Sequence, residues 1–268
     1  MTNDVSQDWP VGTVERRAVL AATVHDRGGN LLEGLRRLAT PLREVFAGFG
    51  VLATTRTAPA VVSFLEVDLG ANVVRDRPSD EHVGAHRREA VRLALEFKPS
   101  IVLYSDLDHV MRWIEADRAE LEQHLEVLPA DFLVIGRTED ARSACPRRLR
   151  LTEAIVNHIY ELTTGRAWDL MFAFRAMSPA AALAIVEHGT ENSIASDIEW
   201  PMLAEQRGLS IAYREANGLS YRIVEDFDDE ADRHDTDPIA WVTRVEIANR
   251  HAQALKPVCV PRSTATTQ

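Results

Sequence analysis

Short apolar runs alternate with longer amphipathic segments along most of this chain, and this alternation limits the fold more than any other feature. The first run, Ala18–Val24, ends at a turn, after which leucines recur at helical spacing and predict a helix over 30–47. Chains that repeat strand and helix in this way form mainly parallel sheets with helices on both faces. We therefore predict an α/β protein with three αβα layers around a mixed, mainly parallel sheet.

The same pattern places the remaining elements. Further strands are predicted at 50–55, 71–74, 100–104, 131–135, 172–177 and 210–213. Further helices are predicted at 59–68, 80–97, 110–128, 179–188, 197–207 and 238–255, with one more that ends at Thr164, and residues 137–150 are predicted to form a basic loop. The expected organisation is an N-terminal tail (1–16), the main domain (17–223), an acidic loop with a C-terminal helix (224–256) and a second tail (257–268).

Composition excludes several classes of protein. With 30 Lys and Arg against 41 Asp and Glu, the formal net charge is −11, which opposes broad binding to nucleic acid or to an anionic membrane. Two distant cysteines, Cys145 and Cys259, are too few for a zinc cage and do not suggest a disulfide framework. The acidic, polar N-terminus does not resemble a signal peptide, and no apolar run is long enough for a membrane helix. We expect a cytoplasmic protein, with a homodimer as one option.

Two carboxylates follow a predicted strand that is apolar throughout its middle. Asp106 and Asp108 come directly after the predicted strand 100–104. About six acid-x-acid triplets are expected by chance in a chain this acidic, so the pattern alone means little. Its place is more informative, because ligands of open α/β sheets bind beyond the carboxyl ends of the strands. Two carboxylates there can hold one divalent cation, which can bridge the phosphates of a substrate.

Several further motifs accompany the pair Asp106 and Asp108. They are the helix segment 84–88, the segments 164–169 and 174–178, Asp197-Ile-Glu199 placed before Gly208, Tyr221-Arg222, and the opening Val24-His-Asp26. With these motifs the chain resembles family-2-type glycosyltransferases of the GT-A fold, which use nucleotide sugars. The resemblance covers about residues 17–222 and includes features of polyprenol-phosphate sugar transferases and of mannosylglycerate synthase. Ala173 stands where the family usually has glycine.

This resemblance implies a metal-dependent enzyme that moves a sugar from a nucleoside diphosphate sugar, of the UDP or GDP type, to a small acceptor. Asp106 and Asp108 would bind Mg²⁺ or Mn²⁺, and Asp197 would act as the base toward the acceptor hydroxyl. The other implied donor-site residues are His25, Asp26, Gly84, His86 and Arg87, and the implied acceptor-side residues are Trp168 and Asp169.

Several assignments stay open at this stage. Many enzymes of this fold take a third metal ligand from a histidine where this chain has Tyr221, so His234 or His109 would have to substitute. His25 is equally compatible with a solvated turn, and Asp197 with a helix cap. Inverting and retaining chemistry are both compatible with the sequence.

The predicted basic loop offers a hint about the acceptor. It contains Arg137, Arg142, Arg147, Arg148 and Arg150 in an otherwise acidic protein. Guanidinium groups bind carboxylate or phosphate at two points, so Arg147 and Arg148 are candidates for an anionic acceptor. A solvated loop is the alternative. For the whole protein, the alternatives are a nucleotidyltransferase and a degenerate, non-catalytic GT-A binding module.

Overall fold

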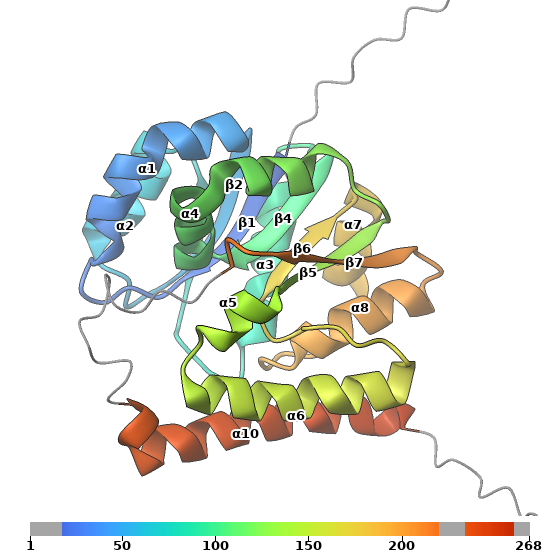
Figure 1. Ribbon diagram of the computed structural model, residues 1–268. Helices are drawn as coiled ribbons and strands as arrows, with labels where there is room; N and C mark the ends of the chain where they lie inside the picture. The colour runs from blue at the N-terminus through green and yellow to red at the C-terminus, as the bar shows by residue number, and fades with distance from the viewer. Residues whose placement is uncertain (1–17, 220–233, 260–268) are drawn as a thin grey trace, which may run out of the picture.

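The computed structural model describes residues 18–219 and 234–259, and within them seven strands form one sheet (Figure 1). The strands are β1 (Ala18–Val24), β2 (Gly48–Thr54), β3 (Asn72–Asp76), β4 (Ile101–Asp106), β5 (Phe132–Arg137), β6 (Phe174–Met177) and β7 (Ile211–Ala216). Their order is β3-β2-β1-β4-β6-β5-β7. Only β6 runs antiparallel to its neighbours β4 and β5, so the sheet is mixed and mainly parallel, as predicted.

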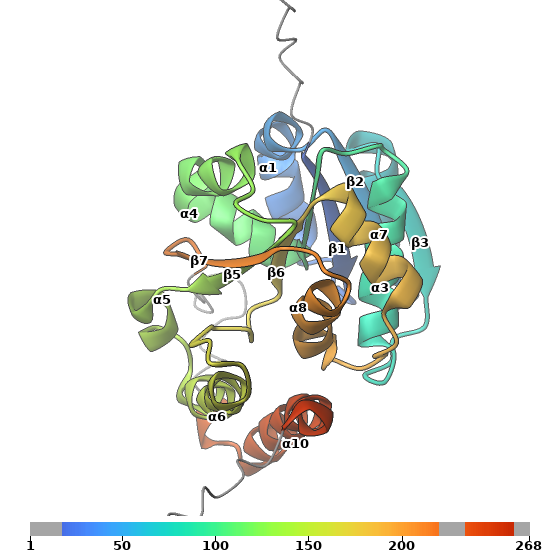
Figure 2. The same cartoon turned by 90° about the vertical axis from the view of Figure 1, so that its right-hand side faces the viewer.

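Helices cover both faces of the sheet and complete the predicted three layers (Figure 2). One face is packed by α1 (Leu31–Val45), α2 (Pro59–Ser63), the π-helical turn η1 (Phe64–Asp68) and α4 (Leu107–Glu126). The other is packed by α3 (Val83–Leu95), α6 (Arg147–Thr164), α7 (Pro179–His188), α8 (Ser196–Gln206) and the end of α10 (Pro238–Leu255). The remaining short helices are α5 (Glu139–Ser143) and η2 (Lys256–Val258). No helix in these parts of the chain is apolar and long enough to cross a membrane.

Alternation along the strands divides the core between the two faces. Leu20 of β1 packs with the α1 and α4 side, whereas its neighbour Val19 packs with the α3 and α7 side, because successive strand residues point to opposite faces. Gly50 of β2 is required by a close approach, since a Cβ there would lie 2.3 Å from the backbone nitrogen of Ala94 in α3. Both strand faces are therefore buried, which accounts for the nearly continuous apolar runs in the sequence.

The strand order reverses direction between β1 and β4. From β1 the chain moves outward through β2 to β3 at the edge, and then returns through α3 to place β4 on the other side of β1. The loops after β1 and β4 consequently diverge and leave room between them. This is the position at which open α/β sheets bind ligands.

The C-terminal helix α10 packs against the main domain. It lies beside α6 and runs in the same direction, since Asp235 just before α10 contacts Arg148 near the start of α6 and Cys259 just after it contacts Thr163 near the end. His251 of α10 is fully buried. The predicted helix 238–255 is therefore present with the same bounds. Tyr221, most of the acidic loop and both predicted tails, except residues 257–259, lie outside the described residues.

The prediction of a basic loop over 137–150 was wrong. Arg137 is the last residue of β5, α5 follows it, and Arg147 begins α6. Local signals account for both helices, because the Thr138 hydroxyl accepts a hydrogen bond from the Ala141 amide at the start of α5, and Pro146 precedes the first turn of α6. Helix α4 also begins at Leu107, three residues earlier than predicted, so Asp108 lies in its first turn.

Candidate functional site

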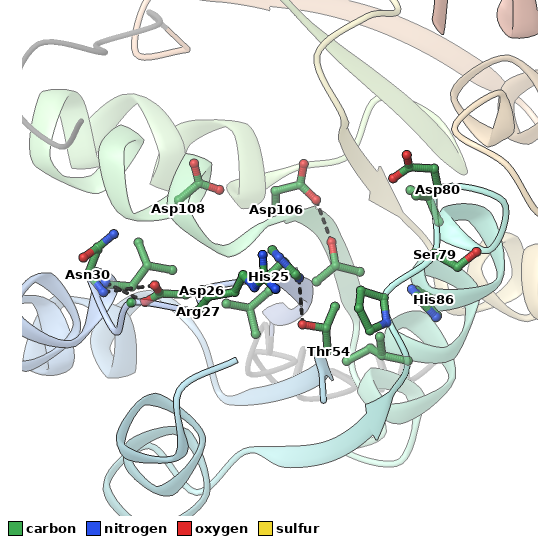
Figure 3. A pocket seen from close by; sticks show the side chains of 17 residues that line it. His25, Asp26, Arg27, Asn30, Thr54, Ser79, Asp80, His86, Asp106 and Asp108 are labelled. Carbon is green, nitrogen blue, oxygen red and sulfur yellow. Dashed lines mark hydrogen bonds between the residues drawn. The ribbon is translucent and has the colours of Figure 1, made fainter. Parts of the chain in front are cut away.

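A cavity of about 560 Å³ opens at the carboxyl ends of the strands, where the strand order reverses (Figure 3). We call it the strand-end cavity. It lies among the turn after β1, the end of β2, the loop after β3, the start of α3 and the end of β4. Its lining residues are Thr23, Val24, His25, Asp26, Arg27, Gly28, Asn30, Leu31, Leu52, Thr54, Pro78, Ser79, Asp80, Val83, His86, Asp106 and Asp108.

Asp106 and Asp108 lie together on one side of the strand-end cavity (Figure 3). Asp106 is the last residue of β4, and its Oδ1 accepts hydrogen bonds from the hydroxyls of Thr23 at 2.6 Å and Tyr104 at 3.2 Å. These bonds orient the carboxylate and leave Oδ2 available. Asp108 in the first turn of α4 forms an ion pair with Arg112, at 3.0 Å from its Oδ2. Both carboxylates are about one third exposed.

The carboxylate pair suits a divalent cation that keeps most of its other ligands outside the protein. Mg²⁺ is commonly held by one or two carboxylates together with water and substrate phosphates, and Mn²⁺ also favours oxygen ligands. His109 is nearby, with Nδ1 at 4.0 Å from Asp106 Oδ2, and this buried Nδ1 has no hydrogen-bond partner. In residues 18–219 and 234–259, no three His, Cys, Asp or Glu side chains form a ready metal cage, and His234 does not line the cavity.

The turn after β1 brings His25 and Asp26 to the strand-end cavity. Asp26 is buried and accepts hydrogen bonds from the backbone amides of Asn30 at 3.0 Å and Leu31 at 2.8 Å, so it caps α1 while lining the cavity. His25 is exposed, and its Nδ1 lies 2.8 Å from the hydroxyl of Thr54 at the end of β2. Sequence reasoning missed Thr54, although the rule that parallel strand ends share one edge would have found it.

Helix α3 contributes its predicted residues unequally. His86 lines the strand-end cavity, and its Nε2 lies 3.1 Å from the carboxylate of Asp76. Gly84 instead packs against the segment before α8, where a Cβ would lie 2.3 Å from the carbonyl oxygen of Glu191. Arg87 is buried below the cavity and does not line it. The assignment of Gly84 and Arg87 to the donor stays a prediction.

Asp197 is the centre of a buried ion cluster rather than the cap of α8, which begins after Ala195. Its Oδ1 accepts from Arg87 at 2.7 Å, its Oδ2 lies 3.3 Å from His251 Nε2, and Arg175 lies 3.9 Å away. Burial alone would raise the pKa of Asp197, but Arg87, His251 and Arg175 hold that pKa well below its usual range. The carboxylate is 5% exposed and does not line the strand-end cavity, so its role as a base stays a prediction.

A second cavity of about 380 Å³ lies at the same edge of the sheet, beyond β5, and we call it the α6 cavity. It is lined by Arg137, Glu139, Arg142, Ser143, Arg150, Glu153, Ala154, Asn157, His158, Glu161, Ala167 and Trp168. Trp168 stacks on Tyr213 with ring centroids 5.5 Å apart. His109 stacks on Phe172, and the guanidinium of Arg137 lies 5.0 Å from the centroid of the same ring. Phe172 thus connects the neighbourhoods of the two cavities.

Three of the five arginines in the predicted basic segment, Arg137, Arg142 and Arg148, form ion pairs, and Arg137 and Arg148 do so in buried or partly buried positions. Arg137 donates to Asp169 at 2.7 Å and to Glu153 at 2.6 Å. Asp169 is completely buried; burial would raise its pKa, but Arg137 lowers it below the usual value. Arg148 forms an ion pair with Asp235 at 2.9 Å. The structure therefore uses Asp169 and Arg148 in internal pairs.

Arg147 and Arg150 differ from these paired arginines. Both side chains are exposed, and neither guanidinium has an ion-pair partner in the described part of the chain. Only Arg150 lines the α6 cavity. The assignment of Arg147 and Arg148 to an acceptor stays a prediction. The position of Arg150 on the cavity makes it a further candidate for binding the acceptor, which the sequence analysis did not select although it lies in the same basic segment.

Comparison with solved structures finds proteins of similar fold. No model of a protein family matches the chain, and no curated protein is similar to it in sequence. A solved glucosyl-3-phosphoglycerate synthase of Mycobacterium tuberculosis is similar in structure, with a TM-score of 0.54 and 14% identity over 93% of this chain and 83% of that one. A crystallised mycobacterial protein gives a TM-score of 0.59 and 13% identity over 92% and 76%.

A complex of the same synthase with Mn²⁺, uridine diphosphate and phosphoglyceric acid gives a TM-score of 0.53 and 14% identity over 93% and 81% of the two chains. At this level of identity the similarity concerns the fold. The chain therefore has an α/β GT-A fold, as its sequence predicted.

Proposed function

We propose that the protein is a glycosyltransferase that binds a nucleoside diphosphate sugar in the strand-end cavity and transfers the sugar to a small anionic acceptor. One observation carries this proposal: Asp106 and Asp108 both line a cavity at the point of a GT-A sheet where the strand order reverses. The similar synthase has been solved with Mn²⁺ and UDP-glucose, and also with phosphoglyceric acid or glycerol 3-phosphate, which supports this donor and acceptor chemistry.

Asp106 and Asp108 would hold Mg²⁺ or Mn²⁺ together with the diphosphate of the donor. When bound, the cation supplies positive charge that stabilises the diphosphate leaving group. Thr23 and Tyr104 hold Asp106 in place for this task through their hydrogen bonds to its Oδ1. His25, Asp26 and His86 line the remaining part of the cavity and would contact the nucleoside.

The acceptor would occupy the α6 cavity. It offers Trp168 as an apolar wall and Arg150 as an exposed guanidinium without an internal ion pair among the described residues. A guanidinium binds a carboxylate or phosphate through two parallel hydrogen bonds. This arrangement supports a small phosphorylated or carboxylated acceptor.

Thermal unfolding with UDP, GDP and nucleoside triphosphates, each with and without Mn²⁺, tests the class of enzyme. We expect a nucleoside diphosphate to stabilise the protein only when Mn²⁺ is present, because the cation joins the two carboxylates to the diphosphate. Stabilisation by nucleoside triphosphates alone would indicate a nucleotidyltransferase. The absence of any response would indicate a degenerate binding module, an alternative favoured by the ion pair of Asp108 with Arg112.

Two matched variants test the acceptor site. Arg150→Gln removes the guanidinium that lines the α6 cavity, whereas Arg147→Gln removes an exposed one on the same turn of α6 that does not. We expect the first variant to lose transfer while keeping slow hydrolysis of the donor, and the second to retain both. Equal rates of transfer in the two variants would place the acceptor elsewhere.

A further inference from the structure

The hydrogen atoms around His25 can be assigned by counting donors. A threonine hydroxyl has one hydrogen, and a backbone carbonyl can only accept. The hydroxyl of Thr57 lies 3.2 Å from the carbonyl oxygen of Val24, and this contact is a hydrogen bond only if Thr57 donates its hydrogen there. In its contact with Thr54, at 3.1 Å, the Thr57 oxygen therefore accepts and Thr54 donates.

The same count determines the tautomer of His25. Because the hydrogen of Thr54 is directed to Thr57, the Thr54 oxygen can only accept at its 2.8 Å contact with His25 Nδ1. The hydrogen of neutral His25 is therefore on Nδ1, and Nε2 carries a lone pair. Nε2 makes no hydrogen bond to any residue in the described part of the chain, and the side chain lines the strand-end cavity (Figure 3).

The hydrogen bonds of Thr57 and Thr54 are shielded from water by burial. Thr57 is 1% exposed and Thr54 is 8% exposed, so water does not compete easily for their hydroxyls. The backbone amide of Asp26 also donates to the Thr57 oxygen at 3.4 Å, which occupies a further lone pair. The hydrogen-bonding role of His25 in the cavity is thus set by residues of β1, β2 and the loop after β2.

We infer that His25 Nε2 selects the nucleobase by accepting a hydrogen bond from a ring N–H, an inference that rests on the proposed binding of nucleotides in the strand-end cavity. Uracil has an N–H at position 3 between two carbonyl groups, and guanine has the equivalent N–H at position 1. Cytosine and adenine have a lone pair at those positions, which would face the lone pair of Nε2. The Thr57-Thr54-His25 relay, which we call the tautomer relay, therefore favours uracil and guanine nucleotides.

UDP and CDP form a matched pair for the test, since they differ only at positions 3 and 4 of the base. Isothermal titration of the full chain with each nucleotide in the presence of Mn²⁺ should give about tenfold or greater preference for UDP, because one hydrogen bond is lost and one repulsive contact is gained with CDP. His25→Ala should reduce the preference to within about twofold by weakening UDP. Circular dichroism confirms that the variants are folded.

Two further variants separate the relay from simple contact. Thr57→Val keeps the shape of a buried residue but frees the Thr54 hydroxyl to donate to His25, so the preference for UDP should fall although His25 is present. His188→Ala on α7, outside both cavities, should behave as the native protein.

The outcomes distinguish this inference from the proposed function. Equal affinity for UDP and CDP in the native protein would overturn the inference while leaving nucleotide binding intact. A preference for UDP that survives in His25→Ala would also overturn it, and would assign base selection to another lining group. If none of the nucleotides binds, the proposed function itself fails and this inference fails with it.

Discussion

At the scale of single residues, the carboxylate of Asp108 can be tested apart from the fold. It lies at the rim of the strand-end cavity, about one third exposed, so its removal leaves the core intact. We expect Asp108→Ala to change the thermal stability little and to weaken Mn²⁺-dependent nucleotide binding by about tenfold or more. Titration with UDP and Mn²⁺ measures this. Glu122→Ala, which removes an exposed carboxylate elsewhere on α4, is the control, and equal affinity in both variants would remove Asp108 from the site.

At Asp197 we expect a large loss of stability instead, because this carboxylate is buried among cations. Asp197→Asn would leave Arg87 and Arg175 without their shared carboxylate, and breaking a buried ion pair costs about 3 to 5 kcal/mol of unfolding free energy. Chemical denaturation measures this cost. If the variant were instead as stable as the native protein but slower by two to four orders of magnitude in sugar transfer, as expected for loss of a general base, the assignment of Asp197 as the base would be supported.

At the scale of elements, the pair formed by α6 and α10 has an apolar outer surface. Nine large apolar side chains are exposed in the described residues, and six of them lie on these two helices: Leu151, Ile155, Leu162, Ile239, Val242 and Val245. Their spacing of three, four or seven residues keeps each set on one side of its helix. Each helix has 18 residues and is about 27 Å long, so the surface is large enough to form much of a dimer interface.

We expect this surface to bind a second copy of the chain. Arg147 lies at the start of α6 and Glu161 near its end, so a twofold axis near Ile155 would bring opposite charges together. Light scattering should give twice the mass of one chain, and Ile155→Glu should give a monomer by placing like charges across the axis. Val67→Glu changes an even more exposed apolar residue on η1 and should stay dimeric. A monomeric native protein would contradict this expectation.

At the scale of the whole molecule, buried carboxylates make stability depend on pH. The pKa values of Asp197 and Asp169 are lowered in the folded protein, mainly by Arg87 and Arg137 respectively acting against burial. A lowered pKa contributes stability at a pH above the unfolded value, and this contribution is lost as the pH falls through the folded value. Burial raises the pKa of Glu153, which offsets part of the loss.

We therefore expect the melting temperature to be highest near neutral pH and to fall as the pH decreases below about 5. The free energy of unfolding should fall with a limiting slope of about 1.4 kcal/mol per pH unit for each proton taken up. Thermal unfolding between pH 7 and pH 3 measures this dependence. Asp169→Asn should be less stable at pH 7 but less sensitive to acid. Glu122→Gln, at an exposed carboxylate on α4, should largely keep the native slope. A melting temperature that does not change with pH would contradict the assignment of these buried charges.

Much of the fold and one part of the candidate site follow from local sequence. The period of the apolar residues predicted the strands and helices, because each element repeats its pattern within a few residues. Asp106 and Asp108 were expected near a ligand because they follow a strand, and parallel strand ends meet at one edge of the sheet. His25 and Asp26 were expected there only because of the family resemblance. The structure places all four on the strand-end cavity. The segment 137–150 was misjudged because its arginines suggested a solvated loop, although Thr138 and Pro146 are helix-start signals.

The sequence by itself thus determined the layered sheet and the edge at which a ligand would bind. Only the tertiary structure decided which charges pair and which stay available. Arg87 meets Asp197 across 110 positions of the chain, and His251 reaches the same carboxylate from α10. Among 30 basic and 41 acidic side chains many such pairs are conceivable, and no periodic pattern selects one. The selection depends on how α3, α8 and α10 pack, because ion pairs form only where packing brings buried groups within a few ångströms of each other.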